Sequence, residues 1–455
     1  MDNTTLNYYK MKRVLILGAG LVSGPIIRHL LEKNYHLTLA SNTPDHARQI
    51  ADNHPNAFIV DWSVEDEDAL STMVENCDLA VSLLPYVFHM TVAEQCLKHG
   101  KHMVTTSYVK PEMQALHDDV KRKGLLFINE IGLDPGIDHM SAMRIIDHIH
   151  KMGGKVKDFY SICGALPAQE SANNPFRYKF SWSPRGVLLA GNNSARFLKG
   201  GKEVNIPTEN LFKDPFSVNF SGVGALDVYP NRDSIEYIDI YGIPEAKTVF
   251  RGTFRFQGWC ESLDAMKKLH LLDPAEYETF GMSYAAFIAK INGFSEHSLR
   301  KDMAAGLGIS EEAIAIQAMD WLGWFSDSLI SIQKTSAFDI TADLMLSKMD
   351  LKINDKDMVA LQHSFLAVYP DGTEEVIRSR MLAYGSPATD TAIARTVSLP
   401  AAIAVEMILE GKIPARGIYR PVISDIYEPV LNALEKLGIK MEEEFGLPLD
   451  QHINS

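Results

Sequence analysis

The chain has 455 residues, of which 46% are hydrophobic, and its formal net charge is −14. This length predicts two or three domains, and the apolar share is typical of a globular protein with a large core. The acidic balance, without a Lys/Arg cluster, argues against nucleic acid or an anionic membrane as partner. No apolar run approaches the roughly 20 residues of a transmembrane helix, and residues 1–10 lack the apolar core of a signal peptide.

The four cysteines, Cys77, Cys96, Cys163 and Cys260, are far apart in the sequence and form no Cys-x-x-Cys pair. This spacing predicts neither a disulfide framework nor a zinc site, and it favours a reducing, cytoplasmic location. The 15 histidines form no cluster with metal-ligand spacing. We therefore expect no metal.

Short apolar segments alternate with helical segments through the first part of the chain. Strands are expected at residues 13–17, 36–40, 57–62, 79–84, 102–107 and 125–129. Six strands joined by helical crossovers predict an α/β fold, with a Rossmann dinucleotide-binding domain over residues 11–138. A long apolar helix, expected at residues 392–409, can pack against this sheet. The chain is therefore predicted to return and complete the domain with residues 388–430.

A glycine-rich turn follows the first strand and reads Gly18-Ala19-Gly20-Leu21-Val22-Ser23-Gly24. The first two glycines permit a tight turn and the close approach of a pyrophosphate, which the N-terminus of the next helix stabilises. The motif departs from G-x-G-x-x-G because Ser23 holds the third glycine position. The strand–turn–helix context makes the motif meaningful in spite of this difference.

The end of the second strand bears on the choice between NAD and NADP. NAD-binding domains tend to carry an acidic residue there for the ribose hydroxyls. This chain has Ser41, Asn42 and Thr43 at that position, with neither an acid nor an arginine. Both cofactors stay open, and the missing acid favours NADP.

The alternation ends at the stretch from Asn129 to His139, where Asp134-Pro135-Gly136 predicts a turn after the sixth strand. A helix is expected from residue 139 to 150. Asp134 therefore lies just past the carboxyl end of a parallel strand, which is where open α/β sheets bind ligands. Asp138 and His139 are adjacent on the helix and do not share a face, so capping or surface roles are expected for them.

The rest of the chain predicts a mixed α/β domain over residues 139–258, completed by residues 355–387, and a helical insert over residues 259–350. Strands are expected at residues 159–164, 235–241, 248–256, 358–369 and 375–383. Within the insert, Ser310 is expected to cap a helix that runs to Trp324. The tryptophans of this helix are expected in the core.

Several irregular stretches together resemble saccharopine dehydrogenase of the L-glutamate-forming type. They are Ser82-Leu83-Leu84-Pro85-Tyr86, Val104-Thr105-Thr106-Ser107-Tyr108, the stretch from Asn129 to His139, the loop from Asn174 to Arg185, Tyr229-Pro230-Asn231-Arg232-Asp233-Ser234, and Arg251-Gly252-Thr253-Phe254-Arg255. The resemblance covers nearly the whole chain. It implies a Rossmann domain, a substrate-binding and dimerisation domain, a helical domain and a homodimer.

The resemblance also implies the reaction. Saccharopine is oxidised with NAD or NADP to L-glutamate and 2-aminoadipate 6-semialdehyde, or formed from them, in lysine synthesis or breakdown. Such chemistry needs a proton acceptor, a cofactor held near the reacting carbon, and cations for the substrate carboxylates.

The predicted site residues combine position in the sequence with this resemblance. The catalytic candidates are Asp134, Tyr108 and Cys163. The cofactor-binding candidates are Gly18, Gly20, Leu21, Val22, Ser41, Asn42, Thr43, Asp61, Leu84, Pro85, Ser107, Leu133, Pro135 and Ser183. The substrate-binding candidates are Tyr86, Ser107, Tyr108, Asp134, Arg232, Thr253, Phe254 and Arg255.

Structural interpretations compete with these roles. Asp134 could cap the turn, Tyr108 could pack against a helix, Cys163 could be inert core, and the arginines could form surface ion pairs. Two other functions also compete. One is an imine reductase of polyamine synthesis resembling carboxynorspermidine dehydrogenase, and the other is a catalytically inactive cofactor-binding regulator.

Overall fold

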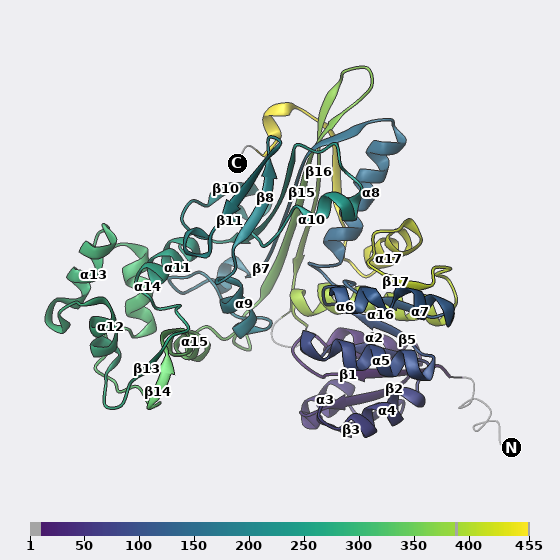
Figure 1. Ribbon diagram of the computed structural model, residues 1–455, viewed down its shortest axis with the longest axis horizontal. Coiled ribbons are helices and arrows are strands. Elements are labelled where there is room, and N and C mark those ends of the chain that lie inside the picture. The colour runs from purple at the N-terminus through teal and green to yellow at the C-terminus, as the bar shows by residue number, and fades with distance from the viewer. Residues whose placement is uncertain (1–10, 387–389, 454–455) are drawn as a thin grey trace. The chain divides into compact units, whose positions relative to one another are not determined.

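The computed structural model describes residues 11–386 and 390–453. Contacts divide the chain into two compact units. Figure 1 labels their helices and strands. The first unit contains the described residues up to 154, together with 379–385 and 390–443, and the second contains 155–378, residue 386 and 444–453. The predicted junction at residues 387–388 and the polar first ten residues lie outside the described residues. The division into three domains stays a prediction.

The first unit is built on a seven-stranded parallel sheet in the order β17-β6-β5-β4-β1-β2-β3. All six predicted strands are confirmed, as β1 (Arg13–Leu17), β2 (His36–Ser41), β3 (Ala57–Asp61), β4 (Leu79–Ser82), β5 (His102–Thr105) and β6 (Leu126–Ile128). The seventh, β17 (Gly417–Tyr419), pairs with β6 and was not predicted. A three-residue strand carries too short a pattern to be recognised.

Helices cover both faces of this sheet. On one face, Leu15 and Leu17 pack with buried residues of α4 (Glu67–Glu75), α5 (His89–His99), α6 (Pro111–Ala115) and α7 (His117–Arg122). Val14 and Ile16 point the other way and are buried too. The unit also contains α2 (Gly24–Glu32), α3 (Pro44–Ala51), α8 (Ile137–Lys151), α16 (Ala392–Leu409) and α17 (Ser424–Lys436). Helix α16 packs on α2, α17 and β5, which confirms the predicted return of the chain.

Helix α16 is also the one helix among the described residues that is long and apolar enough to cross a membrane by length and composition. Its apolar window is 78% buried inside the structure. Burial in a protein core accounts for that composition.

Most residues of a nine-stranded mixed sheet belong to the second unit. In this sheet β12 pairs in parallel with β7, and β15 pairs antiparallel with β7. Its main path runs β10-β11-β12-β7-β15-β16-β18, and β8 joins β12 to β9. The strands are β7 (Lys155–Pro167), β8 (Ala195–Lys199), β9 (Lys202–Ile206), β10 (Phe216–Phe220), β11 (Gly224–Pro230), β12 (Thr248–Arg255), β15 (Asp357–Val368), β16 (Glu374–Tyr384) and β18 (Glu442–Leu447). Four of the five strands predicted after residue 139 are confirmed.

The fifth prediction was wrong, because residues 235–241 contain helix α10 (Glu236–Tyr241). The isoleucines suggested a strand, but Tyr237 and Tyr241 are spaced by four residues and are both buried. The carboxylate of Asp233 accepts from the amide of Ile235 at 2.8 Å before the helix, and Gly242 ends it with a φ of 64°. Local turn chemistry at both ends therefore outweighs β propensity.

The helical segment contains α11 (Trp259–Lys268), α12 (Tyr284–Asn292), α13 (Leu299–Leu307), α14 (Ile314–Leu322) and α15 (Ala337–Lys348), with the short pair β13 (Glu276–Glu278) and β14 (Lys334–Ser336) (Figure 1). The unit also contains α9 (Pro184–Ala190). Ser310 does not cap α14, because its hydroxyl accepts from the amide of Glu312 in a turn before the helix. Trp324 is fully buried, as expected of core, whereas Trp321 is half-buried.

Candidate functional site

The glycine turn lies after β1, beside the end of β4. Gly18 has a φ of +100°, and a Cβ there would lie 3.1 Å from the carbonyl oxygen of Leu83. Gly20 has open space where its Cβ would be. The first glycine is therefore needed for the turn itself, whereas the second leaves a free approach to the backbone. This arrangement fits a pyrophosphate at the N-terminus of α2.

Ser23 takes the place of the third glycine without disturbing the turn. Its side chain is fully buried, and its hydroxyl donates to the carbonyl of Gly20 at 2.8 Å. The serine therefore ties the start of α2 back to the turn. This bond explains how the chain departs from G-x-G-x-x-G and still forms the same element.

The end of β2 presents hydroxyl groups. The hydroxyls of Ser41 and Thr43 lie 3.0 Å apart, and the amide of Thr43 donates to Ser41 at 3.1 Å. Asn42 and Thr43 are exposed, and Asp61 is exposed at the position of β3 that pairs with Ser41. His46, which the sequence did not single out, bonds through Nδ1 to the carbonyl of Ala19 at 2.6 Å and so connects α3 to the glycine turn.

The ends of β4 and β5 carry the next predicted residues. Pro85 and Tyr86 are exposed, and Leu84 is half-buried. The ammonium of Lys110 lies 4.3 Å from the centre of the Tyr86 ring, which is a cation–π contact. Leu21 of the glycine turn is also exposed, and Val22 is half-buried. This edge therefore offers apolar side chains to a ligand as well as polar ones.

His89 is buried between the same two strand ends, and it too was missed from the sequence. Its Nδ1 lies 2.8 Å from the hydroxyl of Ser82, and its Nε2 lies 2.7 Å from the hydroxyl of Ser107. Burial, reinforced by the charge of Lys110, lowers the pKa of His89 to about 4. The imidazole is therefore neutral at neutral pH. A lone histidine between apolar residues carries no periodic signal that would have identified this bridge.

Asp134 occupies a distinct place in its stretch. Every residue from Leu125 to Met143 is buried except this one. Its Oδ1 accepts from the hydroxyl of Tyr108, and the two oxygens lie 3.5 Å apart. Leu133 and Pro135 on either side are buried. The fold thus hides the turn and presents a single carboxylate beside a phenol.

A different carboxylate caps this turn. Asp138 is fully buried, and its Oδ1 accepts from the amide of Gly136 at 2.6 Å. Gly136 has a φ of +148°, and a Cβ there would lie 2.0 Å from the carbonyl oxygen of Gly132. The expected capping role of Asp138 is confirmed. The capping interpretation of Asp134 stays an alternative.

Glu130 lies under the turn in a fully paired polar network. Its carboxylate binds Nε2 of His139 at 2.7 Å, Nε of Arg420 at 2.8 Å and the amide of Val109 at 2.8 Å. Burial acts to raise the pKa of Glu130, but the bonds and charges of His139 and Arg420 hold it below its ordinary value. His139 is fully buried, so the expected capping or surface role was wrong. The sequence could not show that His139 meets Glu130 nine positions earlier.

In the second unit, three predicted residues share one face of the sheet. Cys163 of β7 and Thr253 of β12 are paired in register, and Arg255 lies two positions further along β12 on the same face. Cys163 is buried, and burial is typical of an unreactive thiol. Phe254 points to the opposite face, where it is fully buried against Phe220. Its predicted contact with substrate stays a prediction.

Arg255 is a buried cation within a cage of aromatic rings. Only 5% of the residue is exposed, and its Cζ lies 4.9 Å from the ring centre of Tyr178, 5.3 Å from that of Trp259 and 5.8 Å from that of Tyr229. One nitrogen donates to the carbonyl of Phe254 at 2.8 Å. Within the described part of the chain, Nε of Arg255 and Nε1 of Trp259 have no hydrogen-bond partner. Two donors therefore lack an acceptor.

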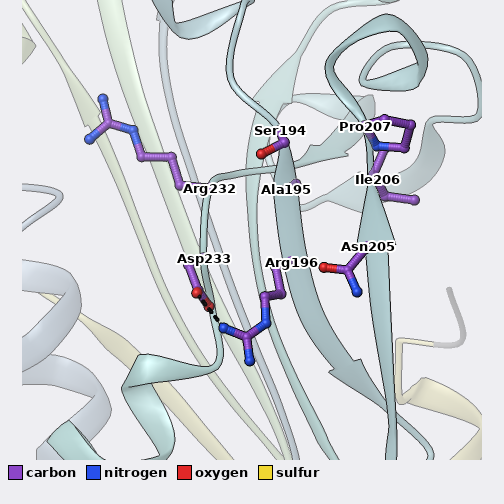
Figure 2. A pocket seen from close by; sticks show the side chains of 8 residues that line it. All are labelled: Ser194, Ala195, Arg196, Asn205, Ile206, Pro207, Arg232 and Asp233. Carbon is purple, nitrogen blue, oxygen red and sulfur yellow. Dashed lines mark hydrogen bonds and ion pairs between the residues drawn. The ribbon is translucent and has the colours of Figure 1, made fainter.

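Arg232 lies in a different setting from Arg255. It follows β11 with a φ of 53° and lines a cavity of about 280 Å³ with Arg196 and Asp233. Figure 2 shows its guanidinium pointing away from Arg196, which instead pairs with Asp233 at 3.0 Å. Ser183 is exposed at the start of α9. The roles predicted for Arg232 and Ser183 stay predictions.

These features define a class of protein. The glycine turn, the parallel sheet and the polar strand ends of the first unit are those of a dinucleotide-dependent oxidoreductase. Among the described residues, no group of three or more His, Cys, Asp or Glu side chains could hold a metal.

Comparison with known proteins identifies the family. Residues 14–128 match the model for the saccharopine dehydrogenase NADP binding domain, and residues 132–439 match that for the saccharopine dehydrogenase C-terminal domain. A Schizosaccharomyces pombe protein named saccharopine dehydrogenase [NADP(+), L-glutamate-forming] is 37% identical over 95% of this chain and 99% of its own length. Apo saccharopine dehydrogenase (L-Glu forming) from Saccharomyces cerevisiae is 35% identical, with a TM-score of 0.88 over 95% of this chain and 99% of that one.

A third relative is longer. The mitochondrial alpha-aminoadipic semialdehyde synthase of Mus musculus is 37% identical over 96% of this chain, which spans 48% of that protein. The chain belongs to the L-glutamate-forming saccharopine dehydrogenase family. The fold class is confirmed, and so is the preference for NADP that the missing acid indicated.

Proposed function

We propose that the chain catalyses the NADP-dependent oxidation of saccharopine to L-glutamate and 2-aminoadipate 6-semialdehyde, or the reverse reaction. The names of the relatives support this reaction over the polyamine imine reductase and over the inactive regulator. The reaction oxidises a C–N bond of the substrate to an imine, and water then splits the imine into an amine and an aldehyde.

One observation carries the proposal, namely the pairing of Tyr108 with Asp134 at the sheet edge that also holds the glycine turn. The phenol and the carboxylate are 3.5 Å apart and both are half-buried. Oxidation of a secondary amine and hydrolysis of an imine each require a proton acceptor at the reacting nitrogen or at water. Asp134 can accept that proton, and Tyr108 can orient the carboxylate or relay the proton.

The cofactor region fits NADP. When bound, NADP supplies the hydride acceptor. Gly18 and Gly20 would receive its pyrophosphate, and the hydroxyls of Ser41 and Thr43 would face its ribose phosphate. The exposed ring of Tyr86 and the hydroxyl of Ser107 lie at the ends of the neighbouring strands β4 and β5.

Arg255 suits the other requirement, a cation for a substrate carboxylate. A buried charge without a partner is costly, and no carboxylate among the described residues pairs with this guanidinium. A substrate carboxylate would accept from the unpartnered Nε of Arg255 and Nε1 of Trp259. Saccharopine carries three carboxylates, so an arginine in this role accords with the proposed substrate.

The proposal is tested by mixing the purified protein with saccharopine and following nicotinamide absorbance, with NADP and NAD in parallel. We expect reduction with NADP and much slower reduction with NAD. Asp134→Asn should lower kcat/KM by about a hundred-fold, because general base catalysis contributes at least that much, while the Kd for NADP stays unchanged. Asp68→Asn, an exposed change on α4, is the matched control. No reduction by protein shown to bind NADP would reject the proposal.

We also propose that the protein forms a homodimer and works in a reducing, cytoplasmic location. The family resemblance supports the dimer, and four buried cysteines that form no disulfide support the reducing location. Sedimentation of the purified protein tests the dimer, and fractionation of the source cells tests the location.

A further inference from the structure

The bridge between Ser82, His89 and Ser107 joins two neighbouring strand ends of the first unit. Ser82 is the last residue of β4, and it is paired in register with Thr105, the last residue of β5. Ser107 follows β5 by two residues. The imidazole of His89, the first residue of α5, lies between the two hydroxyls at 2.8 and 2.7 Å. The hydroxyl of Thr105 lies 3.5 Å from the same Nε2.

Exposure increases along the bridge toward the candidate site. Ser82 is fully buried, His89 is 5% exposed, and Ser107 is half-buried. Only Ser107 can therefore meet a ligand, and the other two residues lie behind it. Next to it, Tyr108 contacts Asp134.

The backbone of Ser107 is held independently of its side chain. The carbonyl of Ser107 accepts from the amide of Glu130 at 3.1 Å, and the amide of Val109 donates to the carboxylate of Glu130. With the backbone held there, the side-chain rotamer and the direction of the hydroxyl hydrogen remain to be set. The hydrogen bond between the Ser107 hydroxyl and Nε2 of His89 can fix both the rotamer and the direction of the hydroxyl hydrogen.

We propose that His89 is a positioning residue, which holds the hydroxyl of Ser107 in the orientation that binds the cofactor or substrate at the sheet edge. This inference rests on the proposed function, because it assigns Ser107 to that site. His89 itself touches no ligand. A neutral imidazole has one N–H and one lone pair, so one serine donates to it and the other accepts. The orientation of Ser107 is thereby coupled to the buried end of β4.

The two ring nitrogens allow a matched pair of variants. The amide nitrogen of asparagine can occupy the place of Nδ1, and that of glutamine the place of Nε2. His89→Asn therefore keeps a bond to Ser82 and loses the bond to Ser107, whereas His89→Gln does the opposite. We expect His89→Asn to lower kcat/KM by roughly ten-fold, the worth of one hydrogen bond, and His89→Gln to stay within about three-fold of the wild type.

A third variant shows whether the effect passes through Ser107. Once Ser107→Ala has removed the hydroxyl, adding His89→Asn should cause no further loss in kcat/KM. His99→Asn is the control, since His99 lies at the other end of the same helix, where it bonds to Ser71. Equal losses in His89→Asn and His89→Gln, or additive losses with Ser107→Ala, would show that His89 only fills space.

Crystal structures of His89→Asn and His89→Gln test the positioning without any assay. The Ser107 side chain should change rotamer in the asparagine variant and keep it in the glutamine variant. If the Ser107 side chain keeps the same rotamer in both variants, the inference is wrong, irrespective of which substrate the enzyme uses. If the wild type fails to oxidise saccharopine, the proposed function fails, and these two structures still decide whether His89 holds Ser107.

Discussion

The two candidate regions, one in each unit, treat buried polar groups in opposite ways. At the sheet edge of the first unit, the buried Glu130 has three partners, and His89 bonds to the hydroxyls of Ser82, Ser107 and, at 3.5 Å, Thr105. On the sheet of the second unit, Arg255 is as deeply buried as Glu130 and His89. Within the described part of the chain, however, neither its Nε nor the Nε1 of Trp259 has a hydrogen-bond partner. The first network is complete without a ligand, whereas the second lacks an acceptor.

This difference distinguishes two roles of buried polar groups, namely stabilising the fold and binding a ligand. A satisfied network rigidifies the fold, so changes in it should act first on stability. An unsatisfied cation lowers stability and gains an interaction only when an anion binds. Changes at Arg255 should therefore act on activity and leave stability intact.

The largest expected effect is on the stability of the first unit. Glu130→Gln removes the negative charge of the carboxylate that His139 and Arg420 both bind. We expect the free energy of unfolding to fall by about 3 kcal/mol, as for other broken buried pairs. Urea unfolding measures it. Glu75→Gln, an exposed change at the end of α4, is the control and should have no effect. If Glu130→Gln and Glu75→Gln had similar free energies of unfolding, the buried network around Glu130 would not stabilise the first unit.

A pH effect of similar size is expected from His89. Its pKa is about 4 when folded and about 6.5 when unfolded, so the unfolded state binds more protons between these values. The free energy of unfolding is therefore unaffected by the titration of His89 above about pH 6.5, and it falls by about 3 kcal/mol as the pH drops to 4.

His89→Gln isolates this contribution in urea unfolding at several pH values. The lowered pKa of Glu130 also removes stability in acid, but it does so in both proteins. The wild type should therefore lose more stability than the variant between pH 6.5 and 4. Parallel curves would mean that His89 titrates normally in the fold.

Arg255→Met tests the opposite behaviour in the second unit. We expect kcat/KM for saccharopine to fall by about a hundred-fold, roughly 2.7 kcal/mol, because a carboxylate loses its charged partner. Methionine fills the aromatic cage without a charge, so the Tm should stay the same or rise. The Kd for NADP should not change. If activity and Tm fell together, Arg255 would be a structural residue.

The smallest expected effect separates the two glycines of the turn. Gly18→Ala forces a Cβ to 3.1 Å from the carbonyl oxygen of Leu83 at a φ of +100°, and it should cost about 1–2 kcal/mol of stability. Gly20→Ala meets open space, so it should leave the Tm unchanged and weaken NADP binding. Calorimetry of both variants tests this. Equal stability losses would mean that both glycines serve the turn alone.

Much of this protein was readable from its sequence. The six Rossmann strands, the glycine turn, helix α16 and the turn at Asp134 follow from local patterns, because strand alternation, helical spacing and glycine or proline turns act over a few neighbouring residues. The motifs around Ser107, Asp134 and Arg255 were long enough to show the family. The missing acid at Ser41 to Thr43 indicated NADP for the same local reason.

The tertiary structure alone decided which polar groups meet. It paired Glu130 with Arg420, which is 290 positions away, placed His89 between two strand ends, and enclosed Arg255 in aromatic rings from three separate segments. It also made residues 236–241 a helix, because capping and burial of Tyr237 and Tyr241 outweighed β propensity. Partners far apart in the chain leave no periodic signal, because only packing brings them together.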